Sequence, residues 1–180
     1  MSRDRAEWHE VQALVARAAQ VRIDCALRDL PRIAPLLTRD DGSATGAFRF
    51  YRLRAATAAP QGCDAAECSV SALLPMTCQR CLGEVQIQAQ GSAHLAFIDD
   101  EAGVSGVPES HDPVITTAGR VSLTELVEEE LLLAMPIVPV HADPAQCQPR
   151  PLEADENPAD AVASAPKQTP FAGLRELMKK

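Results

Sequence analysis

The chain has 180 residues, of which 46% are hydrophobic, and it carries a formal net charge of -8. A compact chain of this length buries roughly two thirds of its unfolded surface, which argues against disorder of the whole chain and against a need for disulfides or metals merely to fold. Residues 61–166 carry a charge of -14, whereas residues 1–60 and 167–180 carry +3 each. Because counterion release depends on cationic side chains, the acidic middle argues against adsorption to nucleic acid by charge alone.

The first third of the chain predicts two helices and two strands in alternation. Residues 6–18 place apolar side chains, beginning with Trp8, at the spacing of an amphipathic helix. Residues 20–25 alternate apolar and polar side chains, as a strand does. Asp29 precedes a leucine and a proline as a helix N-cap does, and predicts a second short helix. Residues 45–58, rich in arginine and aromatic side chains, predict a strand with both faces partly covered.

The middle of the chain predicts a pair of long strands. Residues 67–76 alternate strictly, and a turn at 78–83 follows. In residues 84–97 the apolar side chains stay on odd positions across Gly91, which indicates a long strand with a bulge at the glycine. A polar loop and a short strand at 114–117 come next.

A capping box marks the start of the last helix. Ser122 and Glu125 have the Ser-x-x-Glu spacing in which each side chain satisfies a free backbone N–H of the first turn. We expect a helix over residues 123–135, ended by the following proline, with Glu128 and Glu129 facing water. Its buried stripe is predicted to consist of Leu123, Leu126, Val127, Leu131 and Ala134.

Together these elements predict an α+β domain over residues 1–142, with a mainly antiparallel sheet and a few short helices. Residues 143–169 are rich in proline, alanine and acid and almost without bulky side chains, which predicts a disordered, flexible acidic linker. Residues 170–180 regain apolar side chains, among them Phe171 and Leu174, at helical spacing. We interpret this last stretch as a docking segment.

Nothing in the sequence predicts a signal peptide or a membrane span. The N-terminus alternates charges, and the longest apolar run, 131–140, is about half of what a bilayer requires and contains two prolines. We therefore expect a cytoplasmic protein that does not contact membranes. Thiols stay reduced in that compartment, so the six cysteines are expected to be free, metal-bound or redox-active.

Cys78 and Cys81 form a Cys-x-x-Cys pair for which three interpretations stay open. A redox pair of the thioredoxin type opens a helix, but the residues that follow this pair have the period of a strand. A strand-to-strand turn suits a zinc knuckle, whose two-residue spacer lets two sulfurs bind one ion. Reduced cysteines packed as small apolar side chains are the third interpretation. His141 and Cys147 are the natural completion of a four-ligand site, although a second Cys-x-x-Cys is missing.

Other chemistry has weaker support in the sequence. The strand predicted at 45–58 combines cations with aromatic side chains, as single-stranded RNA surfaces do: Arg49, Phe48, Phe50 and Tyr51. Because its aromatic side chains occupy both even and odd positions, they point to both faces, which favours an ordinary strand with a packed core. Histidines elsewhere have no ligand or nucleophile spacing. The sequence contains no phosphate loop, dinucleotide fingerprint or nucleophile elbow, so we expect no enzyme.

Several blocks of the sequence resemble one protein family. Four blocks occur in the order typical of the YceD family: Cys-Gln-Arg-Cys-Leu at 78–82, Glu-Glu-Leu-Leu-Leu-Ala-Met-Pro at 129–136, Cys147, and Pro-Phe-Ala-Gly-Leu at 170–174. The C-terminal block departs from the pattern, because Thr169 stands where members of the family commonly have asparagine.

The resemblance implies a bacterial cytoplasmic protein that is needed for normal levels of 23S ribosomal RNA, through its synthesis, processing or stability. It implies no catalytic residues, and it leaves zinc open as a cofactor. We expect a non-catalytic factor that reaches large-subunit ribosomal RNA or its precursor through a protein partner and does not bind DNA. The residues expected at its contacts are Arg80, Leu82, Phe171 and Leu174.

Two other functions are kept as alternatives. One is a zinc-dependent RNA-binding module that uses Cys78, Cys81, His141 and Cys147 as its ligands. The other is a ribonuclease, which the sequence disfavours because it offers no general acid and base pair.

Overall fold

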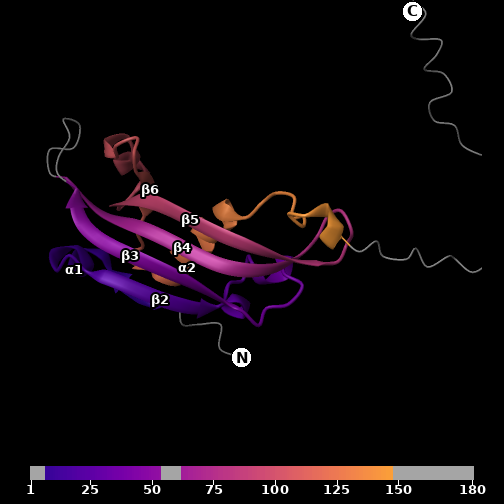
Figure 1. The fold of residues 1–180 in the computed structure, drawn as a ribbon. Helices are drawn as coiled ribbons and strands as arrows, with labels where there is room; N and C mark the ends of the chain where they lie inside the picture. Colours follow the sequence, from indigo (N-terminus) through magenta and orange to yellow (C-terminus); the bar gives the residue numbers. More distant parts are fainter. Residues whose placement is uncertain (1–6, 54–61, 148–180) are drawn as a thin grey trace, which may run out of the picture. The chain divides into compact units, whose positions relative to one another are not determined.

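The computed structural model describes residues 7–53 and 62–147. Within them, a five-stranded sheet of order β2-β3-β4-β5-β6 is accompanied by a two-stranded sheet of β1 and β7 (Figure 1). The strands are β1 (Trp8–Glu10), β2 (Gln20–Ala26), β3 (Ser43–Leu53), β4 (Cys63–Thr77), β5 (Glu84–Ile98), β6 (Asp112–Ile115) and β7 (Arg120–Ser122). The α-helices are α1 (Val11–Ala16) and α2 (Leu123–Ala134), and the 3-10 turns are η1 (Leu27–Asp29), η2 (Ala34–Leu36), η3 (Glu101–Gly106) and η4 (Pro144–Gln146).

The predicted α+β class with a mainly antiparallel sheet is confirmed. Strands β2 to β5 pair antiparallel in chain order, and β6 joins β5 in parallel with Leu95 opposite Asp112. The strands predicted at 20–25, 67–76 and 84–97 are all present. Residues 143–147 of the linker predicted at 143–169 are described, and they contain the 3-10 turn η4. Residues 148–169, the docking segment predicted at 170–180 and the end of the strand predicted at 45–58 lie outside the described residues.

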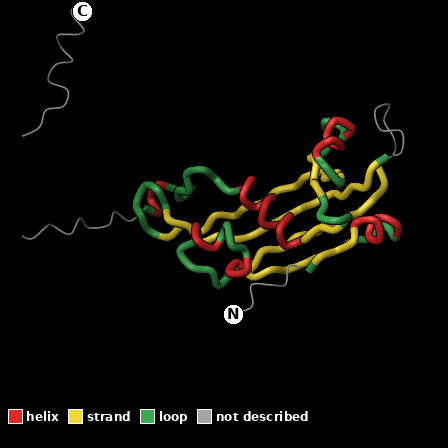
Figure 2. Tube along the Cα trace, turned by 180° about the vertical axis from the view of Figure 1, so that it is seen from behind, coloured by secondary structure: helices red, strands yellow, loops and turns green. Residues whose placement is uncertain are grey.

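Helix α2 covers one face of the large sheet and leaves the other face open (Figure 2). Two strand glycines let it come close. A Cβ on Gly46 would lie 2.2 Å from Val127 of α2, and one on Gly91 would lie 3.3 Å from the Glu130 carbonyl oxygen. Alternate side chains of the sheet fill the space beneath the helix, and the largest fully buried side chains include Phe50, Leu74 and Leu95 of the sheet and Val127 and Leu131 of α2.

Gly91 does not mark a bulge, contrary to the sequence prediction. The register between β4 and β5 runs without interruption from Thr77 opposite Glu84 to Asp64 opposite Phe97. The glycine is needed because the helix backbone passes over it, and not because the strand bends.

The serine half of the predicted capping box is confirmed, but one acidic residue of the helix is not where the sequence placed it. The Ser122 hydroxyl accepts a hydrogen bond from the Glu125 N–H (3.3 Å), and the helix that follows ends at Ala134. Glu129 is exposed as expected. Glu128 was predicted to face water and is instead 3% exposed. Helical spacing alone placed Glu128 at the margin of the apolar stripe, where a neighbouring loop covers it.

That neighbouring loop supplies the partners of the buried carboxylate. Glu128 accepts hydrogen bonds from the backbone N–H of Arg32 (2.6 Å) and of Ile33 (3.3 Å), and its other oxygen accepts one from the Arg32 side chain (3.3 Å). These three hydrogen bonds compensate the carboxylate of Glu128 for the loss of water, and they hold the loop against α2.

The second predicted helix, after Asp29, is wrong. The chain forms only the 3-10 turns η1 and η2 there, and Asp29 ends the first of them rather than capping a helix. Pro31 and Pro35 have no N–H to donate, and each ring clashes with the carbonyl four residues earlier in a continuing helix.

The first predicted helix is shorter than its periodicity suggests. Residues 8–10 pair with β7, with Trp8 opposite Ser122, and α1 begins only at Val11. Trp8 is 43% exposed instead of buried on the helix. A strand partner more than a hundred positions away decided this segment, and local spacing carries no information about it. In the part of the chain that the structure describes, no helix is long and apolar enough to cross a membrane.

Candidate metal centre

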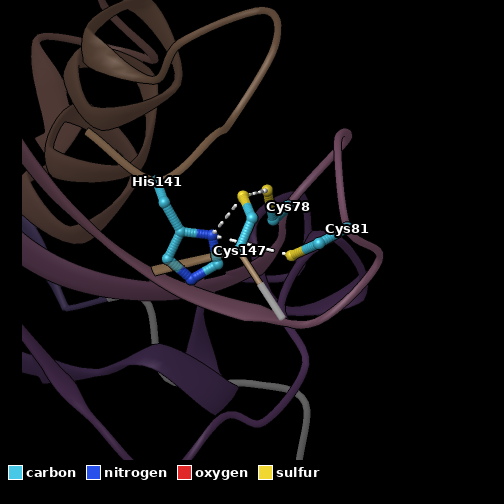
Figure 3. Close-up of side chains that lie close together, drawn as sticks. All are labelled: Cys78, Cys81, His141 and Cys147. Carbon is cyan, nitrogen blue, oxygen red and sulfur yellow. Dashed lines mark hydrogen bonds between the residues drawn. The ribbon is translucent and has the colours of Figure 1, made fainter. Parts of the chain in front are cut away.

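The loop between β4 and β5 holds Cys78 and Cys81 in a closed turn. The Cys78 N–H donates to the Gly83 carbonyl (2.8 Å), and the Leu82 N–H donates to the Cys78 carbonyl (2.8 Å). Leu82 adopts a left-handed backbone with φ of 60°, which costs a residue with a Cβ roughly 1–2 kcal/mol. The turn accepts this strain and brings both sulfur atoms to the same side of the loop (Figure 3).

The segment after α2 returns to this turn and delivers the other two candidates. The Gln79 N–H donates to the Pro139 carbonyl (2.9 Å), which ties the segment to the Cys-x-x-Cys loop just before His141. The Asp143 carboxylate then accepts from the Ala145 N–H (2.8 Å) and starts η4, whose end places Cys147. Two short stretches of backbone, far apart in sequence, are thus fastened side by side.

The four ligand atoms of Cys78, Cys81, His141 and Cys147 lie within 4.8 Å of one another (Figure 3). The sulfurs of Cys78 and Cys147 are 3.9 Å apart, and His141 Nδ1 is 3.7 Å from the Cys81 sulfur and 3.4 Å from that of Cys147. In tetrahedral zinc sites, bond lengths of about 2.3 Å to sulfur and 2.0–2.1 Å to nitrogen imply edges of about 3.8 Å and 3.6 Å. These three spacings are close to those edges, and the Cys78–Cys147 separation is far longer than a disulfide bond of about 2.05 Å.

The ring of His141 is oriented for metal binding by its second nitrogen. Nε2 lies 3.1 Å from the carbonyl oxygen of Glu84, which can only accept a hydrogen bond. Nε2 therefore carries the proton, and the lone pair of Nδ1 faces the three sulfurs. A backbone carbonyl that holds the far nitrogen of a ligating histidine is the usual outer contact of a metal site.

Arg80 supplies positive charge beside the cluster. Its Nε donates to the Cys147 sulfur (3.0 Å), and another guanidinium nitrogen donates to the His141 carbonyl (2.9 Å). Three thiolates and one neutral imidazole around Zn²⁺ leave one net negative charge, which a guanidinium in this position balances. The sequence marked Arg80 as a contact residue, and the structure engages it at the cluster.

The pKa values of Cys78 and Cys81 are shifted in opposite directions. Burial of Cys78 favours its neutral form, but the N–H groups of Cys81 and Arg80 and the contacts with His141 outweigh burial and lower the pKa of Cys78 to about 5. For Cys81 the Gly83 N–H favours the thiolate, but burial and the neighbouring thiols prevail and raise its pKa. Cys78 is thus a thiolate at neutral pH, and a bound cation would displace the proton of Cys81.

The donor set has the composition of a structural metal site. Three sulfurs and one nitrogen at tetrahedral spacing are the ligands of closed zinc sites, in which no position is left for a substrate. Zinc bound here would join the β4–β5 loop to the segment after α2. A redox pair is disfavoured because β5, and not a helix, follows Cys81.

The other residues that the sequence singled out lie in different parts of the chain. Leu82 is 63% exposed at the tip of the turn, as a contact residue requires. Phe171 and Leu174 lie outside the described residues. Phe48 and Phe50 are buried, which confirms that these two aromatic side chains of β3 form core, whereas Tyr51 is half-buried.

Sequence reasoning missed two surface features. One is a run of exposed apolar side chains beside the metal centre, from Leu133 to Val138, which had been noted only as too short for a membrane span. The other is the meeting of His94 with His111, whose rings are 5.5 Å apart. The polar residues that alternate along β4 and β5 were the available signal for an open sheet face.

The fold and the site define a class: a small α+β protein in which a sheet loop and the segment after a helix converge on a candidate Cys₃His metal centre. The family model described as large ribosomal RNA subunit accumulation protein YceD matches residues 66–178, a stretch that contains all four candidate ligands. The chain belongs to the YceD family. No solved structure matched it.

Proposed function

We propose that this chain is a non-catalytic factor needed for the accumulation of 23S ribosomal RNA, acting in its synthesis, processing or stability during large-subunit biogenesis in the bacterial cytoplasm. The observation that carries the proposal is the family match over residues 66–178, since the family is described by its role in accumulation of the large ribosomal RNA. The closed donor set supports the non-catalytic part, because four protein ligands leave zinc no free position for chemistry.

The surface beside the metal centre supports contact through a protein partner. Four large apolar side chains are exposed there or on α2 next to it, and we call them the apolar ledge: Leu82 (63% exposed), Leu133 (77%), Ile137 (100%) and Val138 (58%). Leu82 lies on the β4–β5 loop, and the other three lie at the end of α2 or on the segment that follows it. Exposed large apolar side chains are typical of protein interaction sites. The strained backbone of Leu82 also points to function, because strain of this kind persists where a binding surface requires it.

In this proposal the metal ion shapes the ledge. The segment 136–141 carries two of the ledge residues, and the Gln79–Pro139 hydrogen bond and the His141 ligand tie it to the loop that carries Leu82. Zinc would therefore hold the ledge in one conformation and reduce the entropy that partner binding costs.

A zinc-dependent RNA-binding module is the second candidate, and the tetrahedral spacing of the four ligands is the observation that favours it. The two candidates differ in what the metal does. In the module, Cys78→Ser abolishes RNA binding directly. In the accumulation factor, the same substitution lowers the affinity for the protein partner.

The test of the proposed function is a depletion strain complemented with variants. Depletion is expected to lower 23S ribosomal RNA relative to the small-subunit ribosomal RNA, and the wild-type chain is expected to restore the ratio. Ile137→Ser should restore it poorly, whereas Val104→Ser, at an exposed valine in η3 away from the ledge, should restore it fully. A normal ratio in depleted cells would overturn the proposal.

A further inference from the structure

No described helix covers the face of the large sheet opposite α2 (Figure 1). Strand register places Arg22, Ala47, Ser69 and Ser92 in one row across β2, β3, β4 and β5. Because the middle side chains of this row are small, the face dips there into two adjoining hollows of about 600 and 470 Å³, both of which these four residues line. The next row holds Thr45, Ser71 and Gln90, so hydroxyl and amide groups continue along the floor.

The cation in this row is not neutralised within the described part of the chain. Arg22 is exposed and forms neither an ion pair nor a hydrogen bond with any described residue. Arg49, also lining the hollow, is held by Glu67 on the neighbouring strand (Nε to Oε2, 3.0 Å). Asp24, one row away, is bonded to the Thr45 hydroxyl (2.6 Å). Among the charged side chains of these two rows, the Arg22 guanidinium is therefore the one available to bind an anionic ligand.

Charge is divided between the two sides of the sheet. The lining of the hollows contains Arg22, Arg49 and His94 against a single carboxylate, Glu67. On the helix side, Glu125 and Glu129 are exposed. In a chain with a net charge of -8, the hollowed face is therefore a place where an anion is not repelled.

One end of the hollow carries flat rings. His94 lines it, and the His94 ring lies 5.5 Å from that of His111. The Tyr51 hydroxyl is hydrogen-bonded to His111 Nε2 (2.8 Å), and the Arg49 guanidinium lies 6.0 Å from the centre of the Tyr51 ring. Planar groups fixed to one another in this way offer stacking surfaces to a nucleobase.

We propose that this hollowed face binds a short stretch of single-stranded RNA, with Arg22 on a phosphate, the serine and glutamine side chains on sugar or base edges, and the ring cluster against a base. The proposal rests on the proposed function, in which the chain acts on ribosomal RNA, and adds a direct contact to the one made through the apolar ledge. A strand-sheet face that reads unpaired bases needs donors, a cation and rings, and these three occur together here. A protein partner would instead need exposed apolar anchors, but Phe48 and Val70 at the hollows are buried and Val21 is half-buried.

The binding test uses the full chain and a fluorescein-labelled oligouridylate of twelve nucleotides, followed by fluorescence anisotropy at several salt concentrations. Arg22→Ser is expected to weaken binding about ten-fold, because it removes a charge-assisted hydrogen bond. It should also lower the salt slope by about 0.7, the value for one phosphate contact on a single strand. Arg28→Ser, at an exposed arginine of η1 that does not line the hollow, is the matched control and should change neither quantity.

A second variant keeps the test independent of any one cation. Ser69→Glu places a carboxylate on the floor at an exposed position and should abolish binding while the thermal midpoint stays near that of the wild type. The inference is overturned if the oligouridylate does not bind, if Arg28→Ser weakens binding as much as Arg22→Ser, or if a duplex RNA of equal length binds as well. If binding fails while depletion still lowers 23S ribosomal RNA, this inference is wrong and the proposed function stands. If binding holds while depletion has no effect, the proposed function is wrong.

Discussion

Replacing Cys147 by serine is expected to release zinc and to loosen the end of the domain that carries the apolar ledge. Cys147 and Cys78 are 69 residues apart along the chain, so a metal ion that joins them closes a long loop. By the chain-entropy relation for cross-links, closing a loop of that size stabilises the folded state by about 4 kcal/mol. For a chain of 150–250 residues this corresponds to a fall in the thermal midpoint of about 8–16 °C.

The measurement is zinc content by mass spectrometry, on protein purified from zinc-supplemented cells without chelator, together with thermal unfolding of the same samples. The wild type should contain one zinc ion per chain, and Cys147→Ser should contain less than a tenth of that. Cys63→Ser is the control, because Cys63 lies at the start of β4, is likewise partly buried and is not part of the cluster. Its zinc content should stay at one per chain.

Two results would refute this reasoning. Wild-type protein without stoichiometric zinc, after growth in zinc, would show that the four ligand atoms pack together as reduced groups. A Cys147→Ser variant that keeps its zinc and its thermal midpoint would show that the metal binds elsewhere.

Two further substitutions test the packing of α2. Glu128→Gln keeps one acceptor oxygen but turns an amide NH₂ toward the donors of the loop, and it should lower the free energy of unfolding in urea by about 1–3 kcal/mol. The control, Glu129→Gln at an exposed position, should change that free energy by no more than about 0.5 kcal/mol. Equal changes in the two variants would contradict the pairing of buried Glu128 with the loop. Gly46→Ala puts a Cβ 2.2 Å from a methyl carbon of Val127 and should cost about 1–3 kcal/mol. Adding Val127→Ala removes that methyl group, so the double variant should be less destabilised than the sum of the single ones, and strict additivity would show that the two residues do not meet.

Local pattern was sufficient for much of the fold. Period-two alternation located β4 and β5, because each strand has one face on the core and one open, and the Ser122–Glu125 spacing located the start of α2. The ligand types and the Cys-x-x-Cys spacer were also legible, because two sulfurs on a tight turn are a local property. Two of the predictions that failed, at Trp8 and after Asp29, concern segments whose state is set by a distant strand or by prolines.

By itself the sequence determined the strand pattern, the helix cap, the candidate ligand set and the family, since each depends on residues close together in the chain or on their order. Only the tertiary structure decided that His141 and Cys147 meet the two cysteines of the β4–β5 loop, that Glu128 is buried and that Arg22 has no ion pair among the described residues. These properties arise from contacts across tens of residues. Such contacts depend on strand register and on how α2 lies across the sheet, and no local pattern encodes them.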